Sequence, residues 1–151
     1  MNASDFIAAI APAAQASAKN TRIPASFVVA QGALESGWGT SALAMQAYNL
    51  FGVKADASWH GAVMEMNTSE FIQGQRVTEP ATWRKYPDWQ ACMDDHATFL
   101  VANPRYHPAF SCTSGSAFAM AVAAAGYSTD PQYGQKLVSI IRTHNLSSLD
   151  C

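Results

Sequence analysis

The chain contains 151 residues with a mass of 16.2 kDa, long enough to bury a hydrophobic core without help from disulfides or metals. Hydrophobic residues make up 49% and charged residues 13% of the chain, against about 25% charged in an average domain, which excludes a disordered chain. The net charge of −2 and the pI of about 6.0 argue against a nucleic-acid partner and a cationic membrane binder, and no apolar run approaches the roughly 18 residues of a membrane span.

Apolar residues at helical spacing predict three helices in the first third of the chain. The first covers residues 4–19, with Ser4 or Asp5 as its N-cap. The second covers residues 23–36 and ends at Gly37, because glycine readily takes the left-handed conformation that closes a helix. A short third helix is expected over residues 41–46.

The middle of the chain loses the helical period. Between residues 56 and 90, apolar residues lie among polar ones and glycines, which favours a small antiparallel hairpin or an irregular lobe. Helices return after this lobe: one begins at Asp88 as N-cap, one covers residues 116–125, and one starts at the Asp130-Pro131 pair. The sequence therefore predicts an α+β fold, predominantly α, in a single domain over residues 1–151.

The N-terminus and the cysteines bear on the compartment in which the protein works. Asp5 is the first charged residue and Lys19 the first cation, so the chain shows no secretory signal peptide. We expect either that an export signal has been removed or that the protein leaves its cell by another route. Three cysteines, Cys92, Cys112 and Cys151, leave open three free thiols or one disulfide.

The segment around Glu35 is the most informative for function. Glu35 lies at the C-terminal end of an apolar predicted helix, where apolar neighbours and the negative end of the helix dipole both disfavour a charged carboxylate. A carboxyl group that stays protonated is what a general acid requires near neutral pH. Gly37 and Gly39 leave room beside it, and Trp38 offers an apolar wall or a sugar-stacking face. The simpler alternative is a helix-end glutamate that points to water.

Two further segments supply possible partners for Glu35. Glycoside hydrolysis commonly uses two carboxyl groups, and Glu70 in the predicted lobe is the candidate partner, with Glu65 and Glu79 as rivals. Each of these glutamates is otherwise an ordinary solvated strand residue. Tyr127 lies on a glycine-containing turn between two helices, from which its hydroxyl can project into a cleft; the alternative is a core aromatic.

Other site chemistries are weakly supported. Cys92, His96, His107 and Cys112 are possible zinc ligands, but their spacing matches no compact zinc pattern. We therefore expect no metal and no cofactor. Most aromatic side chains should pack in the core, and a few should line a groove suited to an extended glycan.

Several short motifs occur in a fixed order along the chain. They are Ile-Pro-Ala-Ser at 23–26, Ala-Leu-Glu-Ser-Gly-Trp-Gly at 33–39, Asn-Leu-Phe-Gly-Val-Lys-Ala at 49–55, Arg84-Lys85-Tyr86, Asp95-His96, Phe99-Leu100, Asn103, Arg105-Tyr106 and Ala-Gly-Tyr-Ser-Thr-Asp-Pro at 125–131. Over about residues 5–146 the sequence resembles the peptidoglycan-cleaving β-N-acetylglucosaminidases of glycoside hydrolase family 73, which includes the flagellar rod-cap hydrolase domain.

The resemblance implies a lysozyme-like fold, in which a helical lobe and a small β lobe flank a substrate groove. It implies cleavage of the β-1,4 bond after N-acetylglucosamine, with Glu35 as general acid, Glu70 as second carboxylate and Tyr127 as a residue that stabilises the reacting sugar. We expect the side chains that bind the glycan to be Trp38, Tyr48, Asn49, Phe51 and Tyr133. The sequence departs from the family pattern around residues 56–82, which affects Glu70 more than Glu35.

Mechanism and biological setting stay open at this stage. Glu70 acts as base on a water in an inverting scheme, whereas the sugar's acetamido oxygen attacks the anomeric carbon in a substrate-assisted scheme, with Tyr127 orienting that group. The expected substrate is the peptidoglycan glycan strand, in the periplasm or cell wall. The favoured setting is an interbacterial toxin delivered by a secretion machine and paired with an immunity protein; the alternatives are a phage endolysin, a detached flagellar hydrolase domain and a non-catalytic glycan-binding module.

Overall fold

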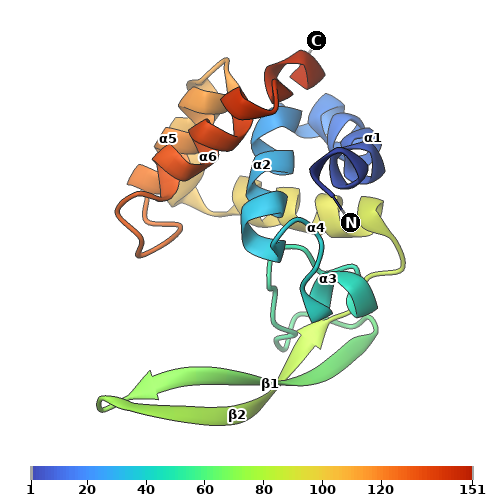
Figure 1. The fold of residues 1–151 in the computed structure, drawn as a ribbon, viewed down its shortest axis with the longest axis vertical. Helices are drawn as coiled ribbons and strands as arrows, with labels where there is room; N and C mark the ends of the chain where they lie inside the picture. The colour runs from blue at the N-terminus through green and yellow to red at the C-terminus, as the bar shows by residue number, and fades with distance from the viewer. Residues whose placement is uncertain (1, 151) are drawn as a thin grey trace.

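The structure, a computed structural model, describes residues 2–150, apart from the side chain of Glu70. It consists of a helical body with a long β-hairpin projecting from one end (Figure 1). The body contains α1 (Ala3–Thr21), α2 (Ala25–Ser36), α3 (Ala42–Ala47), α4 (Trp89–Ala102), α5 (Gly115–Ala124) and α6 (Tyr133–Thr143), with the 3-10 segments η1 (Pro104–Ser111) and η2 (Leu146–Asp150). The predicted α+β fold, predominantly helical, is confirmed.

The hairpin pairs β1 (Val63–Ile72) with β2 (Gln75–Arg84) in antiparallel register. Val63 faces Arg84 at the base, Ile72 faces Gln75 at the tip, and an isolated bridge joins Lys54 to Trp83. Gln73 and Gly74 form the turn and both have positive φ, which is the conformation that two-residue hairpin turns require. The change of sequence period after residue 56 thus marks a real change from helix to strand.

Helix ends follow local capping chemistry with small shifts from the prediction. Asp88 caps α4 with its side-chain oxygen, as expected, and Ser41, predicted as the first residue of α3, caps that helix in the same way. The α1 helix starts earlier than predicted because Asn2, not Ser4 or Asp5, accepts the capping hydrogen bond from the Asp5 N–H, at 2.8 Å. The sequence offered several good capping residues within one turn, and propensity alone does not rank them.

Two other boundaries were wrong by about two residues. The α2 helix begins at Ala25 rather than Ile23, with Pro24 as its N-cap residue. The last helix begins at Tyr133 because residues 131 and 132 form a turn, in which the Asp130 carboxylate accepts from the Gln132 N–H at 2.9 Å. Between α4 and α5, residues 104–111 form the 3-10 segment η1.

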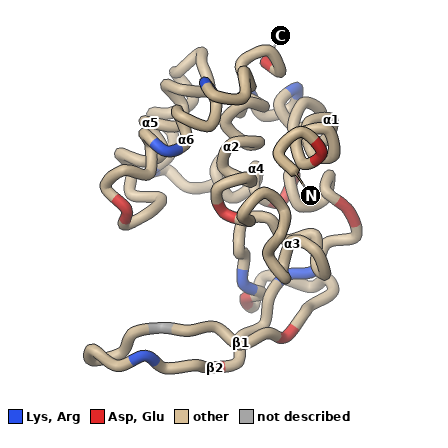
Figure 2. Tube along the Cα trace, viewed as in Figure 1, with Lys and Arg blue, Asp and Glu red and all other residues tan. Residues whose placement is uncertain are grey.

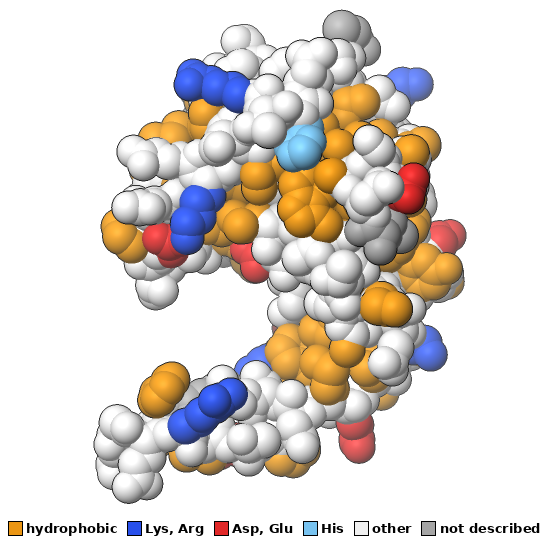
Figure 3. Space-filling view, viewed as in Figure 1, with side chains coloured by type: hydrophobic (Ala, Val, Ile, Leu, Met, Phe, Trp, Pro, Cys, Tyr) orange, Lys and Arg blue, Asp and Glu red, His pale blue; other side chains and the backbone are white. Residues whose placement is uncertain are grey.

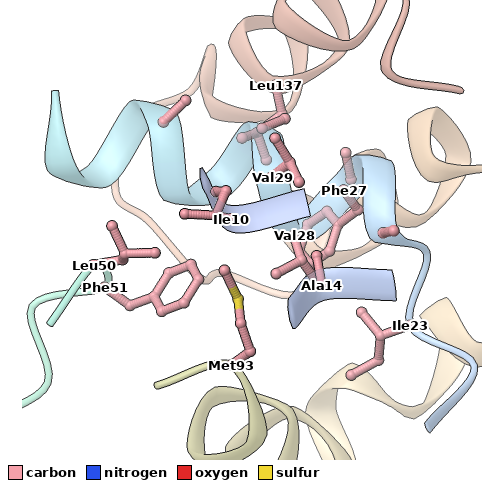
Figure 4. Close-up of a cluster of buried hydrophobic side chains, with 14 of the residues drawn as sticks. Ile10, Ala14, Ile23, Phe27, Val28, Val29, Leu50, Phe51, Met93 and Leu137 are labelled. Atoms are coloured by element: carbon pink, nitrogen blue, oxygen red, sulfur yellow. The ribbon is translucent and has the colours of Figure 1, made fainter. Parts of the chain in front are cut away.

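The core forms around α2, whose residues 25–33 are all buried. Side chains from α1, α2, α4, α6 and the 50–51 loop meet there, as Figure 4 shows. The α5 helix begins close to α2: a Cβ on Gly115 would lie 1.9 Å from the Ser26 hydroxyl oxygen, so only glycine fits. Because residues 25–33 are packed in the core, the direction of α2 and hence the position of its C-terminal end are fixed by the packing.

No helix among residues 2–150 is both long enough and apolar enough to cross a membrane. The cysteines Cys92 and Cys112 are free thiols, and the predictions for Cys151 lie outside the described residues. Cys92 is buried, and this burial raises the pKa of its thiol to about 12.

Candidate functional site

Glu35 lies at the end of α2 that points toward the hairpin (Figure 1). It is the only charged residue in α2, and Figure 2 shows an acidic position at that end of the helix. The space-filling view in Figure 3 shows the molecule hollowed between the helical body and the hairpin. The Glu35 residue is exposed rather than enclosed by apolar neighbours, so a ligand that enters the hollow can reach its carboxyl group.

A sharp turn follows Glu35 and fixes the end of the helix. Gly37, Trp38 and Gly39 have φ values of 58°, 59° and 79°, a left-handed run that strongly favours glycine at its two ends. The Ser36 hydroxyl donates to the Gly32 carbonyl at 2.6 Å and accepts from the Gly39 N–H at 2.8 Å. The two glycines therefore serve the turn itself, and the expected space beside Glu35 stays a prediction.

Three buried or half-buried side chains support the Glu35 carboxyl group. The Tyr133 hydroxyl donates to Glu35 Oε1 at 2.7 Å and accepts from Gln31 Nε2 at 3.0 Å. The Tyr127 ring stacks on Tyr133 with a centroid separation of 5.7 Å and an interplanar angle of 9°. Burial, together with the negative charge of Glu35, raises the pKa of both phenols above that of free tyrosine, so both remain hydrogen-bond donors at neutral pH.

Among the predicted site residues, Glu35, Tyr127 and Tyr133 are thus brought together. Phe51 lies next to this group: its ring stacks on the ring of His96 with a centroid separation of 3.8 Å. A cavity of about 250 Å³ opens beside this group, lined by Phe51, Gly52, Val53, Arg84, Asp95, His96, Phe99 and Tyr127. The cavity lies where the helical body meets the base of the hairpin.

The other predicted glycan-binding residues have different surroundings. Trp38 packs against Phe6 and His144, with centroid separations of 5.7 and 4.8 Å. Tyr48 packs against Trp89 at 4.5 Å. Asn49 is buried, and its amide group binds the backbone of Val53 and Arg84. Their roles in binding a glycan stay predictions.

The hairpin register separates the three candidate second carboxylates. Residue 70 pairs with Val77, residue 79 pairs with Thr68, and residue 65 pairs with Thr82 near the base. Position 70 therefore lies close to position 79 and away from position 65 along the ladder. The side chain of Glu70 lies outside the described part of the structure, so its catalytic role stays a prediction.

Sequence reasoning missed the polar network that connects the two lobes. Arg84 at the end of β2 binds the Asp95 carboxylate at 2.8 Å and Asp56 at 3.3 Å, and the Tyr86 hydroxyl donates to Asp95 at 2.5 Å. It also missed Gln31, a polar residue in an apolar helix one turn before Glu35. A polar side chain in a fully buried helix must find partners, and that was the available signal.

The residues considered as zinc ligands do not form a metal site. Within residues 2–150, leaving aside the side chain of Glu70, no group of three or more His, Cys, Asp or Glu side chains is placed to hold a metal ion. His96 is instead buried and neutral, because desolvation lowers its pKa to about 3.

A helical body, a β lobe and a carboxyl-bearing helix end that faces the hollow between them define the class: the domain has a lysozyme-like, glycoside hydrolase architecture. Solved structures agree. A glycoside hydrolase domain of FlgJ from Salmonella typhimurium superposes with a TM-score of 0.82 at 35% identity, covering 95% of this chain and 98% of that one. The catalytic domain of the autolysin Auto from Listeria monocytogenes superposes with a TM-score of 0.89 at 29% identity, covering 98% and 87%.

The sequence comparisons give the family. The family model described as mannosyl-glycoprotein endo-beta-N-acetylglucosaminidase matches residues 11–146, and the chain belongs to this glucosaminidase family, glycoside hydrolase family 73. Peptidoglycan hydrolase FlgJ of Salmonella typhimurium is 37% identical over 91% of this chain and 45% of its own length. Exo-glucosaminidase LytG of Bacillus subtilis is 36% identical over 96% of this chain and 52% of its own length. The chain thus spans about half the length of these relatives.

Proposed function

We propose that this chain hydrolyses the β-1,4 bond after N-acetylglucosamine in peptidoglycan, with Glu35 as general acid. Family membership supports the reaction class, and relatives that share about 36% identity with the chain are named peptidoglycan hydrolase and exo-glucosaminidase. The observation that carries the assignment is the position of Glu35: an exposed carboxyl on a helix end fixed by core packing, facing the hollow and bound by the Tyr133 hydroxyl at 2.7 Å.

In the proposed reaction the Glu35 carboxyl gives its proton to the glycosidic oxygen as the bond to the anomeric carbon breaks. The departing sugar leaves as an alcohol, and Glu35 becomes a carboxylate that the Tyr133 hydroxyl stabilises with its hydrogen bond. In the inverting route a water forms the new bond to the anomeric carbon and gives its proton to the second carboxylate. In the substrate-assisted route the acetamido oxygen forms that bond as a cyclic oxazolinium, which a water then opens while its proton returns to the Glu35 carboxylate. Tyr127, held protonated beside Glu35, supplies a donor suited to orienting that acetamido oxygen.

Replacing the acid provides the main test. Glu35→Gln keeps the size of the side chain but removes the transferable proton, so release of reducing ends from purified peptidoglycan should fall by about 10²–10⁴-fold. Asp5→Asn, an exposed carboxyl in the first turn of α1, is the matched control and should retain activity. Wild-type turnover in the Glu35→Gln protein would refute the assignment. No reducing-end release by the wild-type chain would instead favour a non-catalytic glycan-binding module.

The anomeric form of the first product distinguishes the two mechanisms. Inversion requires a second carboxylate that activates water from the opposite side, and it predicts an α-anomer and an inactive Glu70→Gln protein. The substrate-assisted route predicts a β-anomer and a partly active Glu70→Gln protein. NMR spectra recorded during digestion give the anomer, and mass spectrometry of the products separates glucosaminidase from muramidase cleavage.

We also propose a setting: delivery of the chain into the periplasm of a competing bacterium, with an immunity protein that covers Glu35. Glycan hydrolysis there would break the wall. The test is expression in a Gram-negative host with and without a periplasmic leader. Lysis should require the leader and Glu35, and co-expression of a neighbouring gene's product should suppress it. Absence of any such inhibitor would favour the endolysin or flagellar setting.

A further inference from the structure

A continuous chain of hydrogen bonds runs from the protein interior to Glu35. His96 Nε2 lies 2.6 Å from Gln31 Oε1, Gln31 Nε2 donates to the Tyr133 hydroxyl at 3.0 Å, and Tyr133 donates to Glu35 Oε1 at 2.7 Å. His96, Gln31 and Tyr133 are 3%, 0% and 4% exposed. Three separate helices, α4, α2 and α6, contribute these side chains, so only the folded body assembles the chain.

In this series of hydrogen bonds, every donor group points toward Glu35. A tyrosine hydroxyl has one proton, and here that proton goes to Glu35 because the Gln31 amide N–H occupies the other side of the oxygen. With its N–H₂ group facing Tyr133, the Gln31 carbonyl oxygen faces His96 and must accept a hydrogen bond. Because His96 Nε2 lies 2.6 Å from this accepting oxygen, Nε2 must carry a proton, which it donates to Gln31.

The direction of the chain determines which Glu35 oxygen carries the acidic proton. Because Oε1 accepts from Tyr133, a proton on the carboxyl group is placed on Oε2. We propose that Gln31 and His96 are positioning residues which, acting through Tyr133, hold the Glu35 carboxyl with its transferable proton on Oε2. This inference rests on the proposed role of Glu35 as the acid.

Neighbouring side chains hold this series of hydrogen bonds in place. Phe51 stacks on His96 at 3.8 Å with an interplanar angle of 10°, and Tyr127 stacks on Tyr133. The charged neighbour of His96 is Asp95, whose carboxylate is already bound by Arg84 and Tyr86. The titratable group that faces both Glu35 and Tyr133 is Tyr127. The stacked rings of Phe51 and Tyr127 cover these hydrogen bonds and keep water away, so water does not compete for the Tyr133 hydroxyl.

A double-mutant cycle tests whether Gln31 acts through Tyr133. Gln31→Met keeps the length of the side chain but cannot direct the hydroxyl, and Tyr133→Phe removes the hydroxyl. Each substitution should lower kcat about 10-fold, the effect expected for losing a hydrogen bond to a charged group, and should leave KM within about twofold. The double variant should show no further loss, because both substitutions remove the same donor to Glu35. Gln135→Met, at an exposed position on α6, is the matched control.

The outcomes separate this inference from the proposed function. Additive losses in the double variant, or wild-type kcat in Gln31→Met, would overturn the positioning role even if Glu35→Gln is inactive. Both single variants should also shift the alkaline limb of the pH–rate profile upward by the same amount, because the Glu35 carboxylate loses the same donor. Unequal shifts would count against the inference.

A measurement on the unmodified protein keeps the inference testable even if a variant does not fold. Nitrogen-15 NMR of the His96 ring should show a neutral imidazole with its proton on Nε2 between about pH 5 and pH 8. A proton on Nδ1, or a charged ring in that range, would reverse or break the chain and overturn the proposal.

Discussion

Gln31 and Glu35 are one helical turn apart on α2, but they differ strongly in their exposure to solvent. Gln31 is fully buried, whereas Glu35 is exposed at the helix end. The interior residue therefore determines geometry and the surface residue is available to a substrate. Tyr133 joins them across helices, with a hydrogen bond to each.

His96 gives a residue-scale prediction about stability and pH. Its pKa is lowered to about 3 in the folded protein by burial, against about 6.5 in an unfolded chain. The unfolded state therefore binds more protons between these values, and the free energy of unfolding should fall as pH drops from about 6.5 toward 3, by up to about 1.4 kcal/mol per unit. Denaturant unfolding at a series of pH values measures this slope.

A His96→Gln protein is the matched control, because it keeps an amide donor for Gln31 but does not titrate. Its slope between about pH 6.5 and 4 should be much flatter than that of the wild type. The carboxylates with lowered pKa values, Asp56 and Asp130, begin to lose their contribution below about pH 5, but both proteins contain them, so the comparison cancels their effect. An unchanged slope would show that His96 is not buried as a neutral ring.

At the scale of elements, the N-terminal end of α2 depends on the other end of the chain. Pro24 is the N-cap residue and makes no side-chain capping bond. Instead the Asp150 carboxylate in η2 accepts from the Ser26 N–H at 2.8 Å and from the Ser26 hydroxyl. A carboxylate at this position also interacts favourably with the positive end of the helix dipole. The last turn of the chain thus stabilises the helix that carries Glu35.

Removing this carboxylate should destabilise the fold. Asp150→Ala should lower the free energy of unfolding by about 1–2 kcal/mol, as expected for the loss of a cap with two hydrogen bonds. Ser147→Ala, at an exposed position in the same turn, should change it by less than about 0.5 kcal/mol. Equal stabilities of the two variants in denaturant unfolding would show that Asp150 does not cap α2.

At the scale of the whole molecule, the orientation of the hairpin depends on a few polar contacts at its base. Arg84 donates to Asp95 on α4, to Asp56 and to the Lys54 carbonyl, and its guanidinium lies 5.0 Å above the Trp59 ring. The Asn49 amide binds the Arg84 carbonyl from the body side. These contacts tie the base of the hairpin to the helical body at one end of the hollow that Figure 3 shows.

Loosening the base should therefore affect catalysis more than folding. Arg84→Gln should lower kcat/KM on polymeric peptidoglycan about 10-fold, which corresponds to the loss of about 1.4 kcal/mol of transition-state stabilisation. The free energy of unfolding should fall by only about 1 kcal/mol, because Arg84 and its partners are partly solvated. Arg142→Gln, an exposed cation on α6, should change neither quantity. A wild-type kcat/KM for Arg84→Gln would show that the hairpin is held by other contacts.

The helices, the hairpin and the position of Glu35 were determined locally and could be predicted from the sequence. Apolar spacing places the helices, Ser41 and Asp88 are caps by their own chemistry, and the glycine after Ser36 ends α2. The family could also be predicted, because the order of the short motifs is a property of the sequence alone. These features are readable because each depends on residues within a few positions of one another.

The tertiary structure decided the contacts that join distant parts of the chain. The hydrogen bonds of Glu35 to Tyr133 and of Gln31 to His96 span 98 and 65 positions, and the capping of α2 by Asp150 spans 124. The exposure of Glu35, and the packing of Trp38 between Phe6 and His144, were settled in the same way. The sequence does not show these pairings. A buried polar side chain needs a hydrogen-bond partner, and only the docking of the helices decides which partner lies within reach.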